Sequence, residues 1–368
     1  MKQVTFNEKV SSAISLMSSM YKLLGGSEIM QDSHDYEEQV RSAVKQFATS
    51  INAKSKVFSD MSLLVNATNK IPLSGLDHWE RLIRSEFHNA LDSSAKANWK
   101  FWEKPSQILT WLDLISWDGY KREKTLRTLS GAAPNSFFFA LAFRRFNDWV
   151  PQVREAAREK LPLIVEATDP KYVVDALCAT LSNWNSWGRI EQKDKDVLLE
   201  IISKEKIGNA LKAKIISSSS GPMQSLMSQV GRTPVLDCYL NEIAENAIQP
   251  SVRAKAYRSQ FEKRMVWLEG RKFEWTDIRY CKGRVKPVIG EREVSVYVEF
   301  NELLEKSSTD TSSIVRRVAA EMLIRELDNI DEECVRLANL FASDKSSTVA
   351  ERGRFALKKL DESKTQGV

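Results

Sequence analysis

Three stretches of the chain repeat one pattern of apolar, basic and small residues. In each, a Val is followed directly by Arg, and a small residue stands four positions after the Val. The stretches are DWVPQVREAAREKL from Asp148, PSVRAKAYRSQF from Pro250 and SSIVRRVAAEML from Ser312. Positions four apart lie on one face of a helix, so the Val and the small residue face the same side. The pattern therefore predicts helices that pack closely against a neighbour.

The spacing of these stretches predicts a structural repeat. Val315 and Val349 are 34 residues apart, Val252 and Val315 are 63 apart, and Val153 and Val252 are 99 apart, close to three units of 33. A further step of 33 before Val153 reaches Tyr120, in a segment that we take as the first unit. A period in the thirties is typical of stacked helix pairs, each of which needs its neighbour to bury its apolar face. We expect about six or seven such pairs.

The first hundred residues follow a helical period without this repeat. Apolar residues recur mostly every three, four or seven positions from Phe6 to about Asn69, and the sequence GGS at 25–27 separates two runs. This pattern predicts an antiparallel helical hairpin that caps the repeats, with a coiled-coil arm gripping a partner as the alternative. We assign residues 1–104 to this hairpin and its capping helices, and residues 105–368 to the repeats.

The repeated residues resemble those of the HEAT-repeat family of α-solenoids. The resemblance rests on the Val-Arg pair, the small residue, the prolines Pro151 and Pro250, and an aspartate five positions before the Val in three copies, namely Asp148, Asp310 and Asp344. It covers about residues 106–360 and implies a HEAT-like, armadillo-like solenoid with a ladder of Asp and Arg contacts between repeats. The expected fold class is therefore all-α, a HEAT-like α-solenoid with an amino-terminal helical hairpin and a small β-containing insertion.

The insertion accounts for the 63-residue interval, which exceeds one repeat by about 30 residues. It spans 265–300 and ends in EVSVYVEF, where Val294, Val296 and Val298 would share one face of a strand. Between residues 250 and 300 the chain has 12 Lys or Arg against 7 Asp or Glu, and aromatic residues are interleaved with them. Insertions in repeat proteins frequently serve binding. We expect a partner to contact Arg264, Trp267, Arg271, Lys272, Trp275, Arg279, Lys282, Arg284 and Lys286.

Two other interpretations of the insertion stay open. Its basic residues could contact phosphates while Trp267 or Trp275 stacks on an unpaired base, with further basic positions at Lys121, Arg122, Lys124 and Arg154. Alternatively, the aromatic residues pin the insertion onto the solenoid and the basic residues form its solvated rim.

The sequence contains no recognisable catalytic constellation, cofactor motif or metal-ligand set. Its three histidines lack ligand spacing, and its four cysteines are too far apart in sequence for a zinc knuckle and are expected to be buried free thiols. No Walker A or Gly-rich dinucleotide motif occurs. We therefore expect no catalytic residues, no cofactor and no metal. No apolar run is long enough to span a membrane and no signal-like segment begins the chain, which favours the cytoplasm.

The function that fits these patterns best is a non-catalytic scaffold or adaptor. Its concave solenoid face and basic insertion would bind a protein partner, while a DNA- or RNA-binding module is the alternative. A third hypothesis follows from HEAT-like DNA glycosylases, which this chain resembles in architecture and which use Trp, Asp and Arg around a lesion. Asp118 and Asp277 each stand near a Trp, but no motif aligns them with the catalytic acid, and Asp118 is expected to cap a helix. The sequence does not indicate an oligomeric state.

Overall fold

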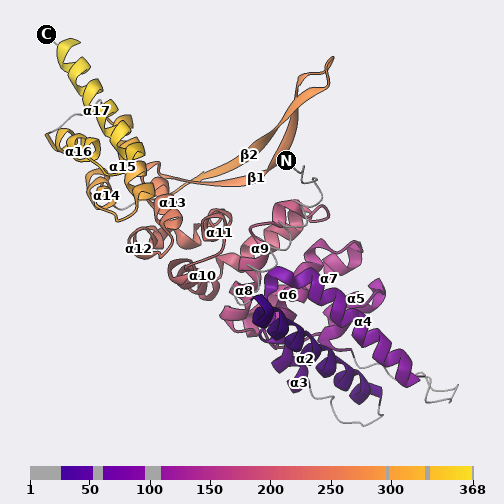
Figure 1. The fold of residues 1–368 in the computed structure, drawn as a ribbon. Coiled ribbons are helices and arrows are strands. Elements are labelled where there is room, and N and C mark those ends of the chain that lie inside the picture. The colour runs from indigo at the N-terminus through magenta and orange to yellow at the C-terminus, as the bar shows by residue number, and fades with distance from the viewer. Residues whose placement is uncertain (1–25, 53–60, 96–108, 296–297, 328–331, 367–368) are drawn as a thin grey trace, which may run out of the picture. The chain divides into compact units, whose positions relative to one another are not determined.

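The protein is an all-α fold that carries one small two-stranded antiparallel sheet, as the sequence predicts (Figure 1). A computed structural model describes residues 26–52, 61–95, 109–295, 298–327 and 332–366. The chain divides into two compact units, Met1–Leu129 and Ser130–Val368. The domain boundary expected between residues 104 and 105 lies outside the described residues.

The first unit is built around the long helix α2 (Gly26–Asn52), which packs against α3 (Ser62–Thr68) and α4 (Leu76–Ala95). Val40, Val44 and Phe47 of α2 are buried at the spacing that the sequence predicts. Gly26 and Ser27, expected in a turn, lie instead in the first turn of α2. The first predicted run, at 6–24, lies outside the described residues. The unit continues through η1 (Leu73–Gly75), η2 (Trp111–Ile115) and α5 (Gly119–Thr128).

The second unit is a succession of helices that the sheet interrupts near its end (Figure 1). Before the sheet the elements are α6 (Ser136–Phe143), η3 (Arg144–Asn147), α7 (Pro151–Ala167), α8 (Pro170–Thr180), η4 (Trp184–Ser186), α9 (Gln192–Ser203), α10 (Glu205–Ser217), α11 (Met223–Val230), η5 (Pro234–Tyr239), α12 (Leu240–Asn246) and α13 (Pro250–Phe261). After the sheet they are α14 (Phe300–Ser308), α15 (Ser313–Arg325), α16 (Glu332–Ala342) and α17 (Ser347–Gln366). Helices α13, α15 and α17 stack in order, α13 against α15 and α15 against α17.

The predicted repeat positions form the core of this stack. Val153, Val252 and Val315 have an exposed fraction of 0%, and the small residues that follow them are also buried. At the weaker fourth copy, a Cβ on Gly353 would lie 2.1 Å from the backbone N of Ala342. Because real Cβ atoms do not approach backbone that closely, the glycine allows α17 to pack tightly on α16. These repeat predictions are confirmed.

One predicted frame is wrong by one residue. Tyr120, which a step of 33 places in register with Val153, has an exposed fraction of 85%. Arg122 instead occupies the position equivalent to Arg154, because its Nη1 donates to the carbonyls of Ser116 and Trp117 at 2.8 and 3.1 Å. The first helix pair of the repeat is therefore spaced 32 residues from the next, measured from Arg122 to Arg154.

The arginine of the repeat stabilises the turn before its own helix. Nη1 of Arg253 donates to the carbonyls of Ala247 and Ile248, and Nη1 of Arg316 donates to those of Asp310 and Thr311, at 2.8 to 3.2 Å. The end of a helix leaves carbonyl groups without partners inside the helix, so a guanidinium there satisfies them. This contact explains why Arg follows the buried Val.

The same arginines also pair with the aspartate of the next repeat. Arg253 donates to both carboxylate oxygens of Asp310 at 2.8 Å, and Arg316 donates to those of Asp344 at 2.6 and 3.0 Å. The hydrogen bond from Arg316 holds the pKa of Asp344 below its ordinary value. The predicted ladder of Asp and Arg contacts is thus present at these two steps.

The sheet is a long hairpin, β1 (Arg264–Asp277) paired antiparallel with β2 (Lys282–Glu293). The strand expected at Val294, Val296 and Val298 is wrong. The strand β2 ends at Glu293. Val294 is buried just beyond it and its N donates to the carbonyl of Lys263 at 2.9 Å, while Val296 lies outside the described residues. The alternating valines imitated a strand, whereas the actual strands are rich in charged residues.

Candidate partner-binding site

The hairpin of β1 and β2, here called the arm (264–293), has two halves with different surroundings. In the basal half (264–269 and 288–293), β1 lies against α11 and α13, whereas Val288 and Ile289 of β2 are exposed. Residues 271–276 and 278–285 of the distal half (270–287) are all exposed. Figure 1 shows the hairpin as one continuous ribbon that begins after α13 and ends before α14. One element therefore combines a packed base with an exposed end.

Hydrogen bonds to a single carbonyl fix β1 of the basal half. The carbonyl of Leu268 accepts from Asn185 at 2.6 Å, from Gln229 at 3.0 Å and from Arg232 at 3.3 Å. These donors come from η4 and the end of α11, so β1 is tied to two separate segments. Such a carbonyl has no free lone pair for another strand or a ligand.

Arg232 holds the first tryptophan of the arm. Its guanidinium lies 4.7 Å from the ring centre of buried Trp184 and 5.5 Å from that of Trp267. Glu269 accepts from Arg232 at 2.7 Å and from Nε1 of Trp267 at 2.8 Å. Burial alone would raise the pKa of Glu269, but these hydrogen bonds lower it. Trp267 is therefore a structural anchor, as the alternative interpretation predicts for the aromatic residues.

Arg292 fixes β2 of the basal half. It donates to the carbonyls of Gly231 and Thr233 at 2.7 and 2.6 Å and to both oxygens of Asp237 at 2.8 and 2.6 Å. Beside it, the buried side chain of Met265 covers Gly231, where a Cβ would lie 2.3 Å from Cγ of the methionine. Sequence reasoning missed Arg292, because nothing in GEREV distinguishes an anchoring arginine from a solvated one.

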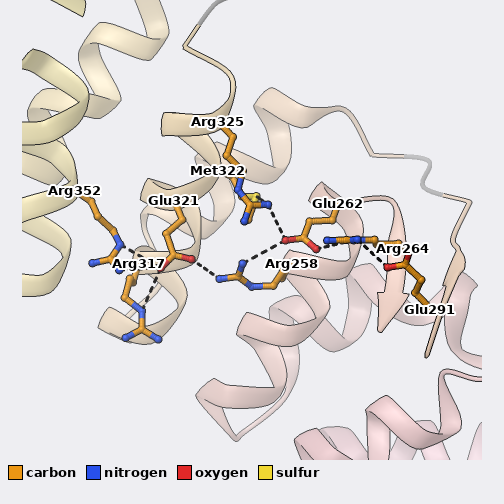
Figure 2. Close-up of polar contacts among 9 residues, drawn as sticks. All are labelled: Arg258, Glu262, Arg264, Glu291, Arg317, Glu321, Met322, Arg325 and Arg352. Atoms are coloured by element: carbon orange, nitrogen blue, oxygen red, sulfur yellow. Dashed lines mark hydrogen bonds and ion pairs between the residues drawn. The ribbon is translucent and has the colours of Figure 1, made fainter. Parts of the chain in front are cut away.

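A chain of Arg and Glu side chains links the base of the arm to the last helices (Figure 2). Arg264 of β1 donates to Glu262 at 3.1 Å and to Glu291 of β2 at 2.8 Å, and Arg325 of α15 donates to Glu262 at 2.9 Å. Arg258 of α13 bridges Glu262 and Glu321 of α15, and Arg352 of α17 reaches Glu321 at 3.1 Å. Networks of shared carboxylates hold side chains better than isolated surface pairs. Arg264 therefore belongs to the attachment of the arm.

The distal half of the arm has two chemically different faces. Cross-strand partners lie on the same face of a sheet, and residues two apart along a strand share a face. The register pairs Phe273 with Val285, Arg271 with Pro287 and Trp275 with Gly283. This apolar face (Arg271, Phe273, Trp275, Gly283, Val285 and Pro287) continues at its basal end into the pair of Leu268 and Ile289.

The opposite, polar face carries most of the charge. It contains Lys272 opposite Lys286 and Glu274 opposite Arg284, with an ion pair between Lys286 and Glu274. A β-bulge between Leu268 and Gly270 shifts the alternation of side chains along β1 by one residue, which places Leu268 on the apolar face. If residues 268–275 formed a regular strand with Glu269 paired, Leu268 would share its face with Lys272 and Glu274 rather than with Phe273 and Trp275.

Exposed aromatic side chains on the arm are a structural anomaly. Phe273 and Trp275 have exposed fractions of 49% and 53%, and their rings meet edge to face at 4.9 Å. Ile278 and Tyr280 at the tip of the hairpin are still more exposed. A two-stranded ribbon has no core behind it, so an apolar face on it gains nothing in the isolated chain.

The nine residues predicted to bind a partner thus separate into three groups. Arg264 and Trp267 attach the arm, while Arg271 and Trp275 lie on the apolar face. The polar face and the tip carry the remaining five, Lys272, Arg279, Lys282, Arg284 and Lys286. Sequence reasoning missed Phe273, Val285 and Pro287, although the alternation in RKFEW contained the signal.

The nucleic-acid hypothesis named four further basic residues outside the arm. Three of these four already have partners within the protein and are not available for phosphate contacts. Arg122 and Arg154 are buried and bond to turn carbonyls, and Lys121 pairs with Asp113 at 2.6 Å. Structural roles account for all three.

The two aspartates that stand near tryptophans in the sequence both accept hydrogen bonds from nearby backbone N–H groups. Asp118 accepts from the N of Tyr120 at 2.9 Å and caps α5 as expected, and Asp277 accepts from the N of Arg279 in the hairpin turn. Among the residues that the structure describes, no group of three His, Cys, Asp or Glu side chains could hold a metal ion, and no helix is long and apolar enough to cross a membrane. The expectation of buried thiols is wrong for Cys238 and Cys281, which are exposed.

The comparisons with known proteins identify no relative. No protein-family model matches the chain, and no curated protein matches it significantly. The interpretation of the arm therefore rests on its own geometry.

Proposed function

We propose that the protein is a non-catalytic scaffold or adaptor, and that the apolar face of the arm binds an acidic protein partner. The single observation that carries the proposal is the register of the hairpin, which gathers Phe273, Trp275 and Val285 on one exposed face. Clustered exposed aromatic residues beside arginine are typical of the residues that dominate protein interfaces. A HEAT-like solenoid would supply the rigid base from which the arm extends, and its concave face would offer a second contact.

The charge of the distal half supports an acidic partner. Residues 270–287 contain six Lys or Arg against two Asp or Glu, and one of these acids, Glu274, is already paired with Lys286. A second copy of this chain would bring the same positive charge, which opposes pairing of two arms. A protein surface with an apolar centre and acidic rim complements both features.

The separation of the two faces argues for protein rather than nucleic acid. Proteins that bind single strands place stacking rings and phosphate-binding side chains along one groove. In the arm, the rings lie on one face with Arg271 alone, whereas Lys272, Arg284 and Lys286 lie on the other. Nucleic acid is therefore the competing outcome of the test below.

A site-specific crosslinking experiment tests the proposal. A photo-reactive amino acid is placed at Val285 on the apolar face and, in a matched control, at the adjacent Arg284 on the polar face, in full-length protein in its native cell extract. We expect a discrete protein adduct from position 285 that is insensitive to nuclease, and a much weaker one from position 284. The adduct partner is then purified, and its affinity is measured for wild type and Trp275→Ala.

Truncation of an interface tryptophan at a well-packed centre costs about 2 kcal/mol or more, which corresponds to roughly 30-fold in affinity. Trp275→Ala should therefore lower the affinity for the partner by that factor, and the thermal stability of the variant should equal that of wild type. An adduct that nuclease destroys would assign the arm to nucleic acid instead. Equal adducts from both positions, or none from either, would refute the proposed function.

A further inference from the structure

A polar pocket of about 220 Å³ lies in the second unit, away from the distal half of the arm. The end of η3 and the turn before α7 form one wall, and the segment between η4 and α9 forms the other. Its lining residues are Arg144, Arg145, Asn147, Asp148, Trp149, Trp187 and Arg189.

Arginines are the most frequent charged residues in the lining of the pocket. Three arginines line it against one acid, Asp148, whose Oδ2 accepts from Arg145 at 3.1 Å and whose Oδ1 accepts from the N of Val150 at 3.0 Å. Arg189 is exposed, and its guanidinium forms no ion pair with any residue in the described part of the chain. An anion entering the pocket would therefore meet a guanidinium that needs a partner.

The backbone around the pocket is held in place. Nη1 of Arg154 donates to the carbonyl of Asp148 at 3.0 Å, which fixes the turn that carries Trp149. The side-chain oxygen of Asn147 accepts from the N of Arg189 at 3.0 Å, which joins the two walls. These contacts preorganise the site, so a ligand need not order it on binding.

The two tryptophans differ in their surroundings. Trp187 packs against the buried ring of Phe143 with 6.2 Å between ring centres. Trp149, in contrast, has an exposed fraction of 68% although it is held on a fixed turn. A large exposed ring on a fixed turn, beside arginines, can stack on a planar group.

We propose that this pocket binds a nucleoside phosphate, with the phosphate contacting Arg189 and the base stacking on Trp149. Guanidinium groups recognise phosphate by charge-assisted hydrogen bonds, and aromatic side chains stack on nucleobases independently of sequence. The volume lies below the 300–1,000 Å³ or so of sites that enclose drug-sized ligands, which favours a mononucleotide over a dinucleotide cofactor. This site goes beyond the proposed protein contact and uses none of the residues of the arm.

Binding is tested by isothermal titration of the full chain with three probes: adenosine monophosphate, inorganic phosphate and adenosine. We expect saturable binding of the nucleotide and affinities at least about 10-fold weaker for phosphate or adenosine alone, since each supplies only one of the two contacts. The variants Trp149→Ala and Arg189→Met should each lower the affinity for the nucleotide by about 10-fold or more. Both side chains are exposed, so thermal unfolding should not change.

Trp275→Ala and Arg284→Met of the arm serve as matched controls and should leave nucleotide affinity unchanged. Conversely, Trp149→Ala should not affect the protein partner of the arm, so failure of one proposal is distinguishable from failure of the other. Absence of saturable nucleotide binding, or equal affinity in wild type and both pocket variants, would overturn the inference. Equal affinities for phosphate and nucleotide would overturn the role of Trp149.

Discussion

The basal and distal halves of the arm have the same secondary structure and similar composition but opposite environments. Trp267 in the basal half is fixed by Glu269 and Arg232, whereas Trp275 eight residues later is half exposed. Arg292 has four hydrogen-bond contacts to the helices, whereas Arg284 is exposed. The comparison shows that a strand of basic and aromatic residues can either attach to the helices or remain exposed to solvent. The segments that pack against the strand decide between these two outcomes.

The largest expected effect is a difference in stability between the variants of Arg292 and Arg284. Arg292→Ala leaves Asp237 and two carbonyls without their charged donor, so the free energy of unfolding should fall by about 3 kcal/mol. Arg284→Ala removes an exposed side chain and should change it by less than about 0.5 kcal/mol. Urea unfolding followed by circular dichroism measures both. Similar losses for the two variants would erase the distinction between the halves.

A pH-dependent effect belongs to the basal half alone. Lys255 donates to the carbonyl of Val266 at 2.8 Å, and burial lowers its pKa from 10.5 to about 8. Between about pH 8 and 10.5 the unfolded state binds more protons, so the free energy of unfolding should rise with pH in this window. Below pH 8 both states carry the charge, and its burial costs a constant amount of about 3 kcal/mol.

The matched variants isolate this contribution. Lys255→Met should be more stable than wild type by about 3 kcal/mol at pH 7, and the difference should disappear by about pH 10.5. Lys272→Met, on the polar face of the distal half, should leave the pH profile parallel to wild type. A constant stability difference for Lys255→Met across the window would contradict the burial of this amine.

The smallest effect concerns two glycines in the paired strands. A Cβ on Gly290 would lie 2.4 Å from Nε1 of Trp267, a ring held by its own contacts, so Gly290→Ala should cost about 1 kcal/mol. Gly270 has no atom within 4 Å of the same position, and Gly270→Ala should have little effect. Thermal unfolding compares them. A larger loss at Gly270 would show that the distal half is packed after all.

The stacked helices were predictable because their residues obey local periodicity. Val153, Val252 and Val315 are buried where the repeat places them, and Gly353 is small where α17 approaches α16. The partners of the Arg ladder, Asp310 and Asp344, are those that the resemblance to HEAT repeats implies. The frame at Tyr120 failed because a shift of one residue rotates a helix by about 100° and exposes the wrong side chain.

The candidate site was only partly predictable. The basic and aromatic composition marked the insertion, but the valines of EVSVYVEF suggested a strand in the wrong place. The bulge at Glu269 decides that the face of Trp275 continues into Leu268 and Ile289, and no composition encodes a single extra residue. The pocket of Trp149 and Arg189 joins residues 40 positions apart and therefore left no local pattern.

The sequence by itself determined the elements that depend on short-range order: the helical repeat, its buried valines, and the turn that each arginine stabilises. The tertiary structure alone decided which tryptophans and arginines are anchored and which face solvent. The physical reason is that periodicity reports the face of an element on which a side chain lies, whereas burial and ion pairing depend on what packs against that face. The proposed functions of the arm and of the pocket both rest on this second kind of information.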